Sequence, residues 1–425
     1  MSAQHDARGQ LRILFVTADR FPPFRPAAKA LFADELPRRG HVIDWLVQAE
    51  GPDVVAGDQP FRGGTAYVAP LNAGRTSWQR VLRYLRSYAH FLRIFALLRS
   101  GRYCAVQVKD LYFGALLAIA AARLAGVPVF YWLAFPHAET LLYGGRLKIA
   151  RFPWLNVLRG TLQKWVLYRV ILPASQHVFV QSEQMLRDIE HEGVPAAKMT
   201  PVPSSVNLAE LAAAGGVQDK PAGERWIVYL GTLVRERHLD TLVRALPDVV
   251  EHVPRARLLL VGSGEMAEDE AALRIAADAA GVGDRVTITG WLPMTEAWSY
   301  VRAADVCVSP YPPLPIFAVA SPTKLVEYMA LGKPVVANHH PEQTPVLRQS
   351  GAGVLCDWAP EAFARAIIDV LEQRSADAAA LGARGVRFVE EHRTHARMAD
   401  LVEHTYRQVL DELDSKLSIR AEASK

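Results

Sequence analysis

Short, β-branched apolar runs alternate with amphipathic helical segments along two stretches of the chain, and this pattern restricts the fold more than any other feature. In the first stretch the predicted strands are 12–17, 42–47, 104–108, 127–133 and 177–181. In the second they are 226–230, 257–262, 286–289, 305–309, 334–338 and 352–356. Such alternation is typical of parallel sheets covered by helices. We therefore predict an α/β protein with two Rossmann-like, doubly wound parallel-sheet domains that face a cleft.

A segment rich in Pro, Gly and Ser, 203–224, separates the two stretches and predicts a connector. We expect an N-terminal domain over 1–208, a second domain over 225–385, and a C-terminal helix within 386–425 that crosses back to the N-terminal domain. In doubly wound sheets, ligands bind beyond the carboxyl ends of the strands. Residues that follow the predicted strands are therefore the first candidates for a site.

Half of the 425 residues are hydrophobic and 22% are charged, so the chain can bury a large core. The longest apolar run, 111–122, is shorter than the roughly 20 residues that a membrane-spanning helix needs. We expect no spanning helix and no secretory segment, and therefore a cytoplasmic protein. Cys104, Cys307 and Cys356 lie in apolar runs and predict reduced, buried thiols rather than disulfides or metal ligands.

Positive charge is concentrated between residues 75 and 169, where fifteen Lys or Arg stand against Asp110 and Glu139. Two segments there, 77–100 and 151–170, combine aromatic and aliphatic residues at helical spacing with basic residues. Helices of this kind suit a surface of anionic lipid, so an anionic membrane surface is a predicted partner. Core-packed helices with a solvated basic face are the alternative. Nucleic acid is not expected, because no recognised binding module accompanies the basic region.

The stretch SPTKLVEYMALGKPVVAN, 321–338, predicts a short helix that leads into a strand. Ser321 is expected to cap this helix, whose free amides would bind an anion, most naturally phosphate. Thr323, Lys324 and Glu327 share one face by helical spacing. The Glu327 carboxylate suits the paired hydroxyls of a ribose. The alternative is that Glu327 only complements the helix dipole or pairs with Lys324.

A second charged cluster lies in YLGTLVRERHLDTLVRAL, 229–246, after a predicted strand and a glycine turn. It contains Arg235 and Arg237, whose guanidinium groups suit a diphosphate. A solvated charged turn is the alternative.

Together these motifs resemble the GT-B, family 4 glycosyltransferases. YLGTLVRERHLDTL, LLLVGSGE, VTITGWLP, AADVCVSPY and SPTKLVEYMALGKPVVAN follow the order and spacing of that family's nucleotide-sugar domain, over about 225–375. RILFVTADRFPP, ELPRRGH, and HVFVQSEQM followed by VPSSVN resemble its acceptor domain more loosely. The resemblance makes 1–208 the acceptor-binding domain and 225–385 the donor-binding domain. It implies a GT-B fold and a retaining, hexosyltransferase-like enzyme that uses a nucleotide-diphosphate sugar and needs no metal or other cofactor.

With the basic helices, we expect a peripheral enzyme at the inner face of the cell membrane. Its acceptor would be a lipid-linked glycan, of the polyprenyl-diphosphate type, in cell-surface polysaccharide synthesis.

The resemblance also assigns roles to single residues. Glu327 corresponds to the ribose-binding second glutamate of the family's Glu-x7-Glu motif, and Arg237 stands where its diphosphate-binding lysine is expected, with a catalytic role in charge stabilisation. Backbone amides of the helix start would hold the diphosphate, and a turn after a later strand would hold the base. The implied donor-side residues are Gly231, Arg235, Arg237, Trp291, Leu292, Ser321, Thr323, Lys324 and Glu327.

Two positions depart from the family pattern. Val319 stands where the first glutamate of the motif is expected, and Thr232 stands where an arginine is expected after Gly231. These departures put the usual contact to the donor sugar, and one phosphate cation, in question.

In the first half, the family places its histidine after the strand predicted at 127–133, where this chain has Leu133. His137 and Glu139 are therefore the predicted catalytic residues there, with plain surface positions as the alternative. Lys109 and Asp110 end another strand and are predicted to contact the acceptor, with an ordinary ion pair as the alternative.

Two other functions are compatible with these motifs. GSGEMA, 262–267, fits a dinucleotide-binding pattern, but the next predicted strand ends at Gly290 and Trp291 without the acidic residue that this fingerprint needs. A nucleotide-sugar epimerase on the same architecture is a closer alternative. Val319 and Thr232 also leave open a sugar-nucleotide binder without catalytic activity.

Overall fold

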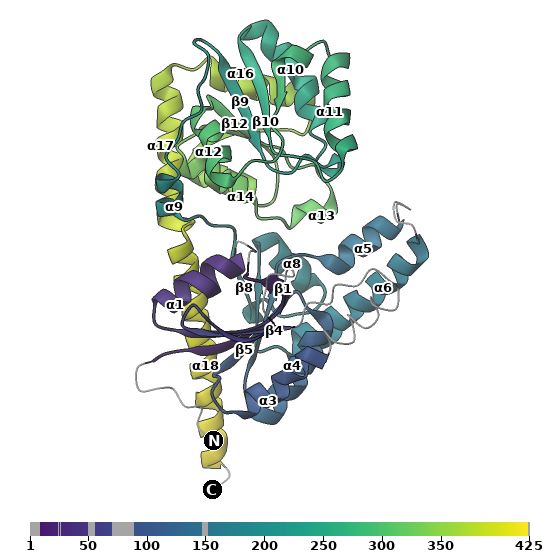
Figure 1. The fold of residues 1–425 in the computed structure, drawn as a ribbon, viewed down its shortest axis with the longest axis vertical. Coiled ribbons are helices and arrows are strands. Elements are labelled where there is room, and N and C mark those ends of the chain that lie inside the picture. Colours follow the sequence, from purple (N-terminus) through teal and green to yellow (C-terminus); the bar gives the residue numbers. More distant parts are fainter. Residues whose placement is uncertain are drawn as a thin grey trace. The chain divides into compact units, whose positions relative to one another are not determined.

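The computed structural model describes residues 9–23, 25, 27–49, 56–69, 89–146 and 152–423. The chain forms two compact units. The first unit comprises Met1–Pro203 and Met398–Lys425, and the second comprises Ser204–Arg397. Figure 1 shows a helix-covered sheet in each unit, so the predicted α/β class with two Rossmann-like domains is confirmed.

The first unit contains an eight-stranded sheet in the order β3-β4-β2-β1-β5-β6-β7-β8. Its strands are β1 (Arg12–Phe21), β2 (Val42–Ala49), β3 (Gly57–Phe61), β4 (Gly64–Ala69), β5 (Ala105–Lys109), β6 (Val129–Leu133), β7 (His177–Val180) and β8 (Met199–Pro201). All neighbours are parallel except the edge pair β3 and β4. This edge hairpin, which was not predicted, turns at Arg62 and Gly63 with positive φ at both.

The two faces of this sheet are covered by different helices. Ile13 and Phe15 belong to a core shared with η1 (Ala28–Glu35), a π-helical segment, and with α18 (His395–Ala423). The other helices of the first unit are α1 (Leu36–Arg38), α3 (Arg93–Arg99), α4 (Tyr112–Ala125), α5 (His137–Arg146), α6 (Pro153–Val166), η2 (Leu167–Ile171), α7 (Leu172–Ala174), α8 (Glu183–His191) and η3 (Ala196–Lys198). The period-two alternation of strand residues thus builds two apolar layers.

The C-terminal helix α18 packs against the first unit. Met398, Val402, Tyr406 and Leu410 are buried at intervals of four residues, so one helix face lies in the core. The Tyr406 hydroxyl donates to the Gln107 side chain in β5. The sequence pattern predicts one helical stretch over about 376–416, whereas the structure has two helices there, because α17 (Ser375–His392) ends before α18 begins.

The second unit contains a six-stranded parallel sheet in the order β11-β10-β9-β12-β13-β14. Its strands are β9 (Arg225–Leu230), β10 (Ala256–Val261), β11 (Val286–Ile288), β12 (Val306–Ser309), β13 (Val335–Asn338) and β14 (Gly353–Cys356). One face packs on α10 (Asp240–His252), α11 (Ala267–Ala279) and α16 (Pro360–Leu371). The opposite face packs on α12 (Met294–Ala303), α14 (Thr323–Ala330), α15 (Gln343–Ser350) and α17.

Three short turns complete the second unit: η4 (Arg235–Arg237), η5 (Gly283–Arg285) and α13 (Pro315–Ala318). The connector predicted at 203–224 also belongs to it, because α9 (Leu208–Ala213) buries Leu211 in the core beside α12 and β9. All eleven predicted strands are present, and the short strands β3, β4 and β8 were not predicted. The three cysteines are free thiols.

The hairpin of α5 and α6 is held together by glycines. A Cβ at Gly160 would lie 2.9 Å from Leu142 Cγ, and a Cβ at Gly145 would lie 2.8 Å from Val157 Cγ2. This close approach covers one side of α6. The other side exposes apolar side chains at Trp154, Leu155, Leu158, Leu162 and Trp165.

Half of the other predicted amphipathic segment, 77–100, lies outside the described residues, which resume at 89. In its described part, Phe91, Ile94, Leu97 and Leu98 are buried, whereas Leu92 is exposed. Within the described ranges, no helix combines the length and the apolar character needed to cross a bilayer.

Candidate active site

Three glycine turns meet at the carboxyl edge of the second sheet. Gly231, Gly262 and Gly290 follow β9, β10 and β11, and all have positive φ. A Cβ at Gly262 would lie 2.1 Å from the Gly231 carbonyl oxygen, so only glycine permits this approach of the two turns. A Cβ at Gly231 would lie 3.0 Å from Lys324 Nζ. The predicted glycine turn therefore lies directly against the predicted phosphate-binding lysine.

Lys324 lies in the first turn of α14, where its side chain is 8% exposed. Its ammonium lies over the Tyr229 ring, 3.8 Å from the centroid. Among the described residues, Nζ has no hydrogen-bond partner. Burial, followed by the charge of Arg237, lowers the pKa of Lys324 well below its ordinary value, and Glu327 opposes this shift. A buried amine without a partner costs stability, and an anion beside it would offset that cost.

Arg237 supplies a second cation to the same place. Its guanidinium lies 5.1 Å from the ring centroid of Tyr311 and 5.0 Å from that of Phe317. Its Nη1 is buried without a hydrogen-bond partner within the described part of the chain. Tyr311 also lies 5.7 Å from Lys324 Nζ, so the two cations share an aromatic wall. Arg235, by contrast, is largely exposed and forms an ion pair with Asp269 at 3.8 Å.

Glu327 lies one helical turn beyond Lys324 and is 9% exposed. Its Oε1 accepts a hydrogen bond from Trp298 Nε1 at 3.3 Å. Burial raises the pKa of Glu327 to about 7, although the Trp298 hydrogen bond and the Lys324 charge lower it. The carboxyl group is therefore held in place and is close to changing its protonation state at neutral pH.

The start of α14 differs from the prediction. Thr323 is the first helical residue, Pro322 precedes it, and no side chain caps the helix. The Ser321 hydroxyl accepts instead from the backbone N–H of Ser204 at 2.9 Å. The predicted Ser321 cap is thus wrong, because a residue distant in sequence engages its hydroxyl. The first amides keep the free donors that bind anions.

The remaining donor-side positions differ in accessibility. Trp291 is strongly exposed, whereas Leu292 packs against the core of the second unit. Val319 is buried, and the Thr232 carbonyl accepts a hydrogen bond from the Tyr229 hydroxyl. Thr232 therefore helps to fix the ring beneath Lys324 but supplies no charge.

In the first unit, Lys109 and Asp110 form part of an ion-pair network. Lys109 Nζ lies 3.2 Å from Asp19 Oδ2 and 3.1 Å from Asp110 Oδ2. Asp110 has a φ of 48° and accepts from the Ala134 N–H at 2.8 Å. Lys109 and Asp110 therefore form the ordinary ion pair that was considered as the alternative to acceptor contact. Sequence reasoning missed Asp19, although its position near the carboxyl end of β1 was a usable signal.

His137 and Glu139 both lie in the first turn of α5 but in different surroundings. His137 is exposed, and its ring lies 5.0 Å from that of Phe135. Glu139 Oε1 accepts from the Tyr168 hydroxyl at 2.8 Å. This contact ties α5 to η2, so Glu139 has a structural function and its catalytic role stays a prediction.

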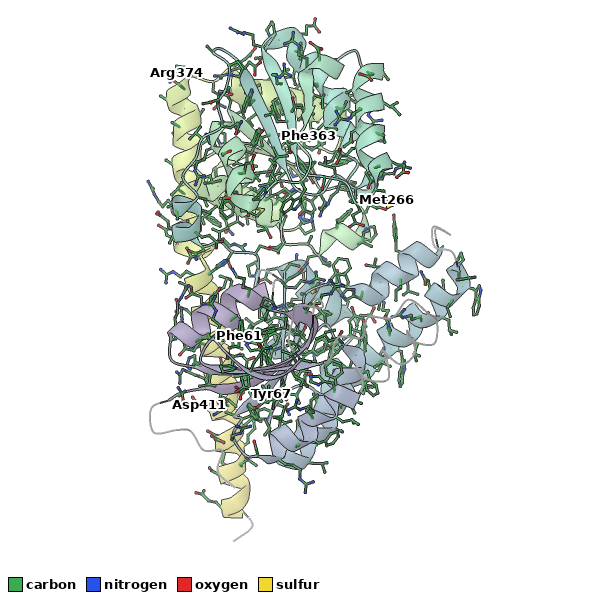
Figure 2. The ribbon with its side chains drawn as sticks, in the orientation of Figure 1. Phe61, Tyr67, Met266, Phe363, Arg374 and Asp411 are labelled. Carbon is green, nitrogen blue, oxygen red and sulfur yellow. The ribbon has the colours of Figure 1, made fainter. Side chains whose placement is uncertain are left out.

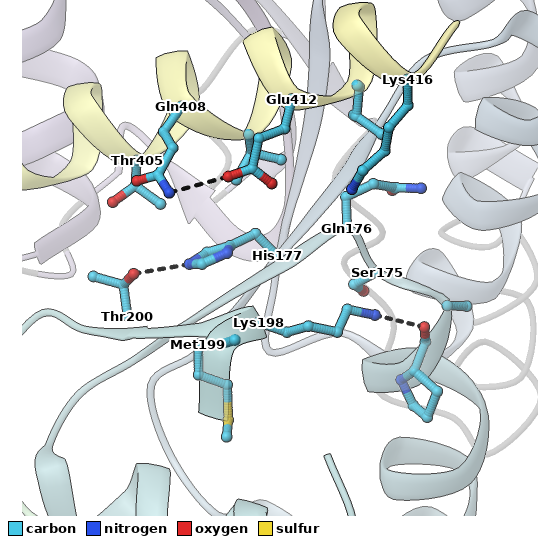
Figure 3. Close-up of a pocket in the computed structure, with 15 residues that line it drawn as sticks. Ser175, Gln176, His177, Lys198, Met199, Thr200, Thr405, Gln408, Glu412 and Lys416 are labelled. Atoms are coloured by element: carbon cyan, nitrogen blue, oxygen red, sulfur yellow. Dashed lines mark hydrogen bonds between the residues drawn. The ribbon is translucent and has the colours of Figure 1, made fainter. Parts of the chain in front are cut away.

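A separate pocket lies beneath α18 (Figure 3). It has a volume of about 530 Å³ and is lined in part by His177, Lys198, Thr200 and Glu412. His177 pairs with Thr200 at 2.8 Å, and burial lowers the pKa of His177 to about 4. The pocket lies at the amino ends of β7 and β8, opposite the strand edge where such sheets bind substrates.

Comparison with solved structures identifies the class of protein. Sucrose-phosphate synthase from Thermosynechococcus elongatus has a TM-score of 0.68 at 20% identity, over 95% of this chain and all of that one. Anabaena HepE in complex with UDP-glucose has a TM-score of 0.61 at 15% identity, over 96% of this chain and all of that one. The fold is GT-B.

Two family models identify the family. "Glycosyl transferase 4-like domain" matches residues 30–204, and "Glycosyl transferases group 1" matches residues 224–373. A mannosyltransferase of Mycobacterium tuberculosis is 26% identical over 89% of this chain and 93% of its own length. It is named as a GDP-mannose-dependent alpha-(1-6)-phosphatidylinositol monomannoside mannosyltransferase. The chain belongs to the GT-B glycosyltransferases, which confirms the resemblance and the enzyme class.

Replacing Lys324 by Met should stabilise the protein. The change removes an amine that has no partner in the described structure and keeps most of the apolar stem, so we expect the free energy of unfolding to rise by about 1–3 kcal/mol. Lys333→Met is the matched control, because its Nζ donates to the Ala304 carbonyl at 3.1 Å and its loss should destabilise. Urea unfolding of both variants checks this. If Lys324→Met were less stable than wild type, the Lys324 amine would have a stabilising partner, contrary to this prediction.

Replacing Glu327 by Gln should change how stability depends on pH. Because the folded pKa is raised to about 7, the carboxyl contributes fully below its ordinary pKa of 4.5, and this contribution is lost as the pH rises through 7. Between pH 5 and pH 8, wild type should therefore lose about 1–3 kcal/mol more stability than Glu327→Gln.

Urea unfolding across this pH range measures that difference. Both proteins are compared in a Lys324→Met background, so that the neighbouring amine does not titrate. Glu390→Gln, at an exposed position of α17, is the control and should follow its parent. Equal pH slopes with and without the Glu327→Gln change would show that the carboxyl titrates normally.

Proposed function

We propose that this glycosyltransferase moves a hexosyl group from a nucleotide-diphosphate sugar to a lipid-linked glycan acceptor, with retention of anomeric configuration, in cell-surface polysaccharide synthesis. One observation carries the donor assignment: Lys324 and Arg237 are buried beside an uncapped helix start, and each has a nitrogen without a hydrogen-bond partner in the described structure. The Arg237 guanidinium, an amine that an adjacent anion would keep charged, and the helix-start amides match the charge and oxygen atoms of a diphosphate.

Glu327 would bind the ribose, because it lies one turn along the same helix and is held by Trp298. The turn at Trp291 and Leu292 would receive the base, as the family resemblance implies. The solved HepE complex contains UDP-glucose on the same fold, which supports a nucleotide-sugar donor.

The reaction breaks the bond between the anomeric carbon and the leaving phosphate oxygen. The acceptor oxygen forms the new bond to that carbon, and its proton passes to the departing diphosphate. Lys324, Arg237 and the helix amides would stabilise the charge that develops on the leaving group; one such donor typically contributes about 3 kcal/mol. Within the first unit, exposed His137 is the residue proposed to contact the acceptor hydroxyl.

The lipid-linked acceptor is supported by the surface of the first unit. The exposed side of α6 carries Trp154 and Trp165, which are 69% and 58% exposed, with Leu158 and Leu162 between them. Exposed Arg159 lies on the same helix, as does Lys164, whose ammonium pairs with Glu192 at 2.6 Å. An apolar face with basic residues suits an anionic membrane surface. The mycobacterial relative is named for a phosphatidylinositol mannoside, which is a lipid.

A sugar-nucleotide binder without turnover is the second candidate. Two observations favour it: Val319 is buried where the family has a glutamate, and Thr232 provides only a carbonyl to its own turn. Incubation with nucleotide sugars and polyprenyl-diphosphate-linked sugars separates the candidates. Sugar attached to the lipid supports transfer, an epimeric nucleotide sugar indicates the epimerase alternative, and binding alone indicates the non-catalytic candidate.

Lys324→Met and Arg237→Met should each weaken nucleotide-diphosphate binding tenfold or more, which corresponds to about 1.4 kcal/mol. Each change removes a buried basic side chain that is proposed to bind the diphosphate. Isothermal titration with UDP and GDP measures the affinity. Arg235→Met is the control and should stay within threefold, because Arg235 is exposed and paired with Asp269. Unchanged affinity in Lys324→Met would refute the donor site.

Membrane attachment should depend on the α6 face. Trp154→Ser/Leu158→Ser/Trp165→Ser should abolish flotation with phosphatidylglycerol vesicles at low salt, because the apolar area that enters the interface is lost. Ile275→Ser, at an exposed apolar position of α11, is the control and should float like wild type. Nucleotide affinity should be the same in all three proteins. Equal flotation of the triple variant would exclude α6 as the membrane contact.

A further inference from the structure

Ser204 is the first residue of the second unit and follows Pro203, where the chain leaves the first unit. Three hydrogen bonds join it to the start of α14. The backbone N–H donates to Ser321 Oγ at 2.9 Å, and the hydroxyl donates to the Ser321 carbonyl at 2.7 Å. The same hydroxyl lies 3.0 Å from Thr323 Oγ1. A connecting segment is thus bonded to the helix that carries Lys324.

These bonds explain why α14 has no cap. Ser321 has the side chain that normally accepts from the first helical amides, but its hydroxyl accepts from Ser204 instead. The Thr323 hydroxyl is also engaged by Ser204. Pro322, between them, has no side-chain acceptor and no backbone N–H. Ser204 thus hydrogen-bonds with both nearby hydroxyls, and no side chain caps the amides of the helix start in the described structure.

The amine next to Thr323 provides the independent sign of a ligand. Lys324 is only 8% exposed, and its Nζ has no partner in the described structure. Thr323 and Lys324 are the first two residues of α14. A hydrogen bond that holds Thr323 in position therefore also restricts the backbone from which the Lys324 side chain extends. Ser205 makes a different contact: its hydroxyl pairs with His395 Nδ1 at 2.9 Å. Ser204 therefore contacts the start of α14, whereas the adjacent Ser205 contacts His395 at the start of α18.

We propose that Ser204 is a positioning residue of the donor site. It holds the uncapped amides of α14, and through Thr323 the Lys324 amine, in the arrangement that a diphosphate needs before the ligand arrives. Donor affinity then depends on the segment that connects the two units, although Ser204 itself need not touch the ligand. This inference rests on the donor site proposed above.

The test compares the affinity of Ser204→Ala and Ser205→Ala for UDP, GDP and inorganic pyrophosphate. Ser204→Ala should raise the dissociation constant at least fivefold for whichever nucleotide binds wild type, and also for pyrophosphate, because the contact acts on the phosphate amides. Ser204→Thr keeps a hydroxyl and should restore affinity to within twofold. Ser205→Ala removes an equivalent hydroxyl from the same segment and should stay within twofold. Isothermal titration at one temperature, on protein shown to be folded, excludes a purely structural loss.

Thr323→Val is the second variant and removes the partner hydroxyl while keeping the backbone amide. It should weaken binding as Ser204→Ala does, and the double variant should be no weaker than the more affected single variant. Affinity within twofold of wild type in Ser204→Ala, with Lys324→Met at least tenfold weaker, would overturn this inference and leave the donor site in place. Equal weakening in Ser205→Ala would overturn it as well. Unchanged affinity in Lys324→Met would remove the donor site and the inference together.

Discussion

The proposed donor site depends on a buried amine without a partner in the described structure, Lys324 over the ring of Tyr229. Such a group opposes folding, so the surrounding apolar packing must offset it. Leu325, Val326, Tyr328 and Met329, on the same short helix, are buried in one core with β9 and β12 (Figure 2 shows how densely side chains fill this unit). The apolar side of the helix therefore holds it in place through the core. Its polar residues, Lys324 and Glu327, are not needed for that packing and can serve ligand binding. Binding then costs little reorganisation.

Lys324 and Glu327 also form an electrostatic pair whose members shift in opposite directions. Burial lowers the pKa of the amine and raises that of the carboxyl, so both groups are drawn toward their neutral forms. A diphosphate beside Lys324 would favour the charged amine, because an opposite charge stabilises it. A charged amine in turn lowers the pKa of Glu327 and favours the carboxylate that accepts ribose hydroxyls. Phosphate and ribose recognition would therefore reinforce each other through protonation.

Most of the fold could be predicted from the sequence, because most strands are continuous apolar runs that can be recognised locally. β9, β10 and β12 are continuous apolar runs, whereas β3, with sequence GDQPF, has no such pattern and forms only by pairing with β4. The helix that carries Glu327 was predictable from its spacing, but its missing cap was not. Ser204, 117 residues upstream, takes the Ser321 hydroxyl, and no local rule describes this contact. Lys109 was likewise identified without Asp19, its ion-pair partner from another strand.

In the first unit, the packing of α5 against α6 leaves an apolar surface exposed. Gly145 and Gly160 allow a close approach of α5 and α6. The side of α6 that carries the small residue Gly160 therefore packs against α5. The larger residues, including Trp154 and Trp165, must then face outward. The alternative, a core-packed helix with a solvated basic face, would bury such side chains, whereas α6 exposes them. Lysine and arginine nearby would attract anionic lipid over a distance of about 10 Å, and burial of the indoles would hold the contact after charge screening weakens it. Membrane binding would thus follow from the same glycines that keep the hairpin together.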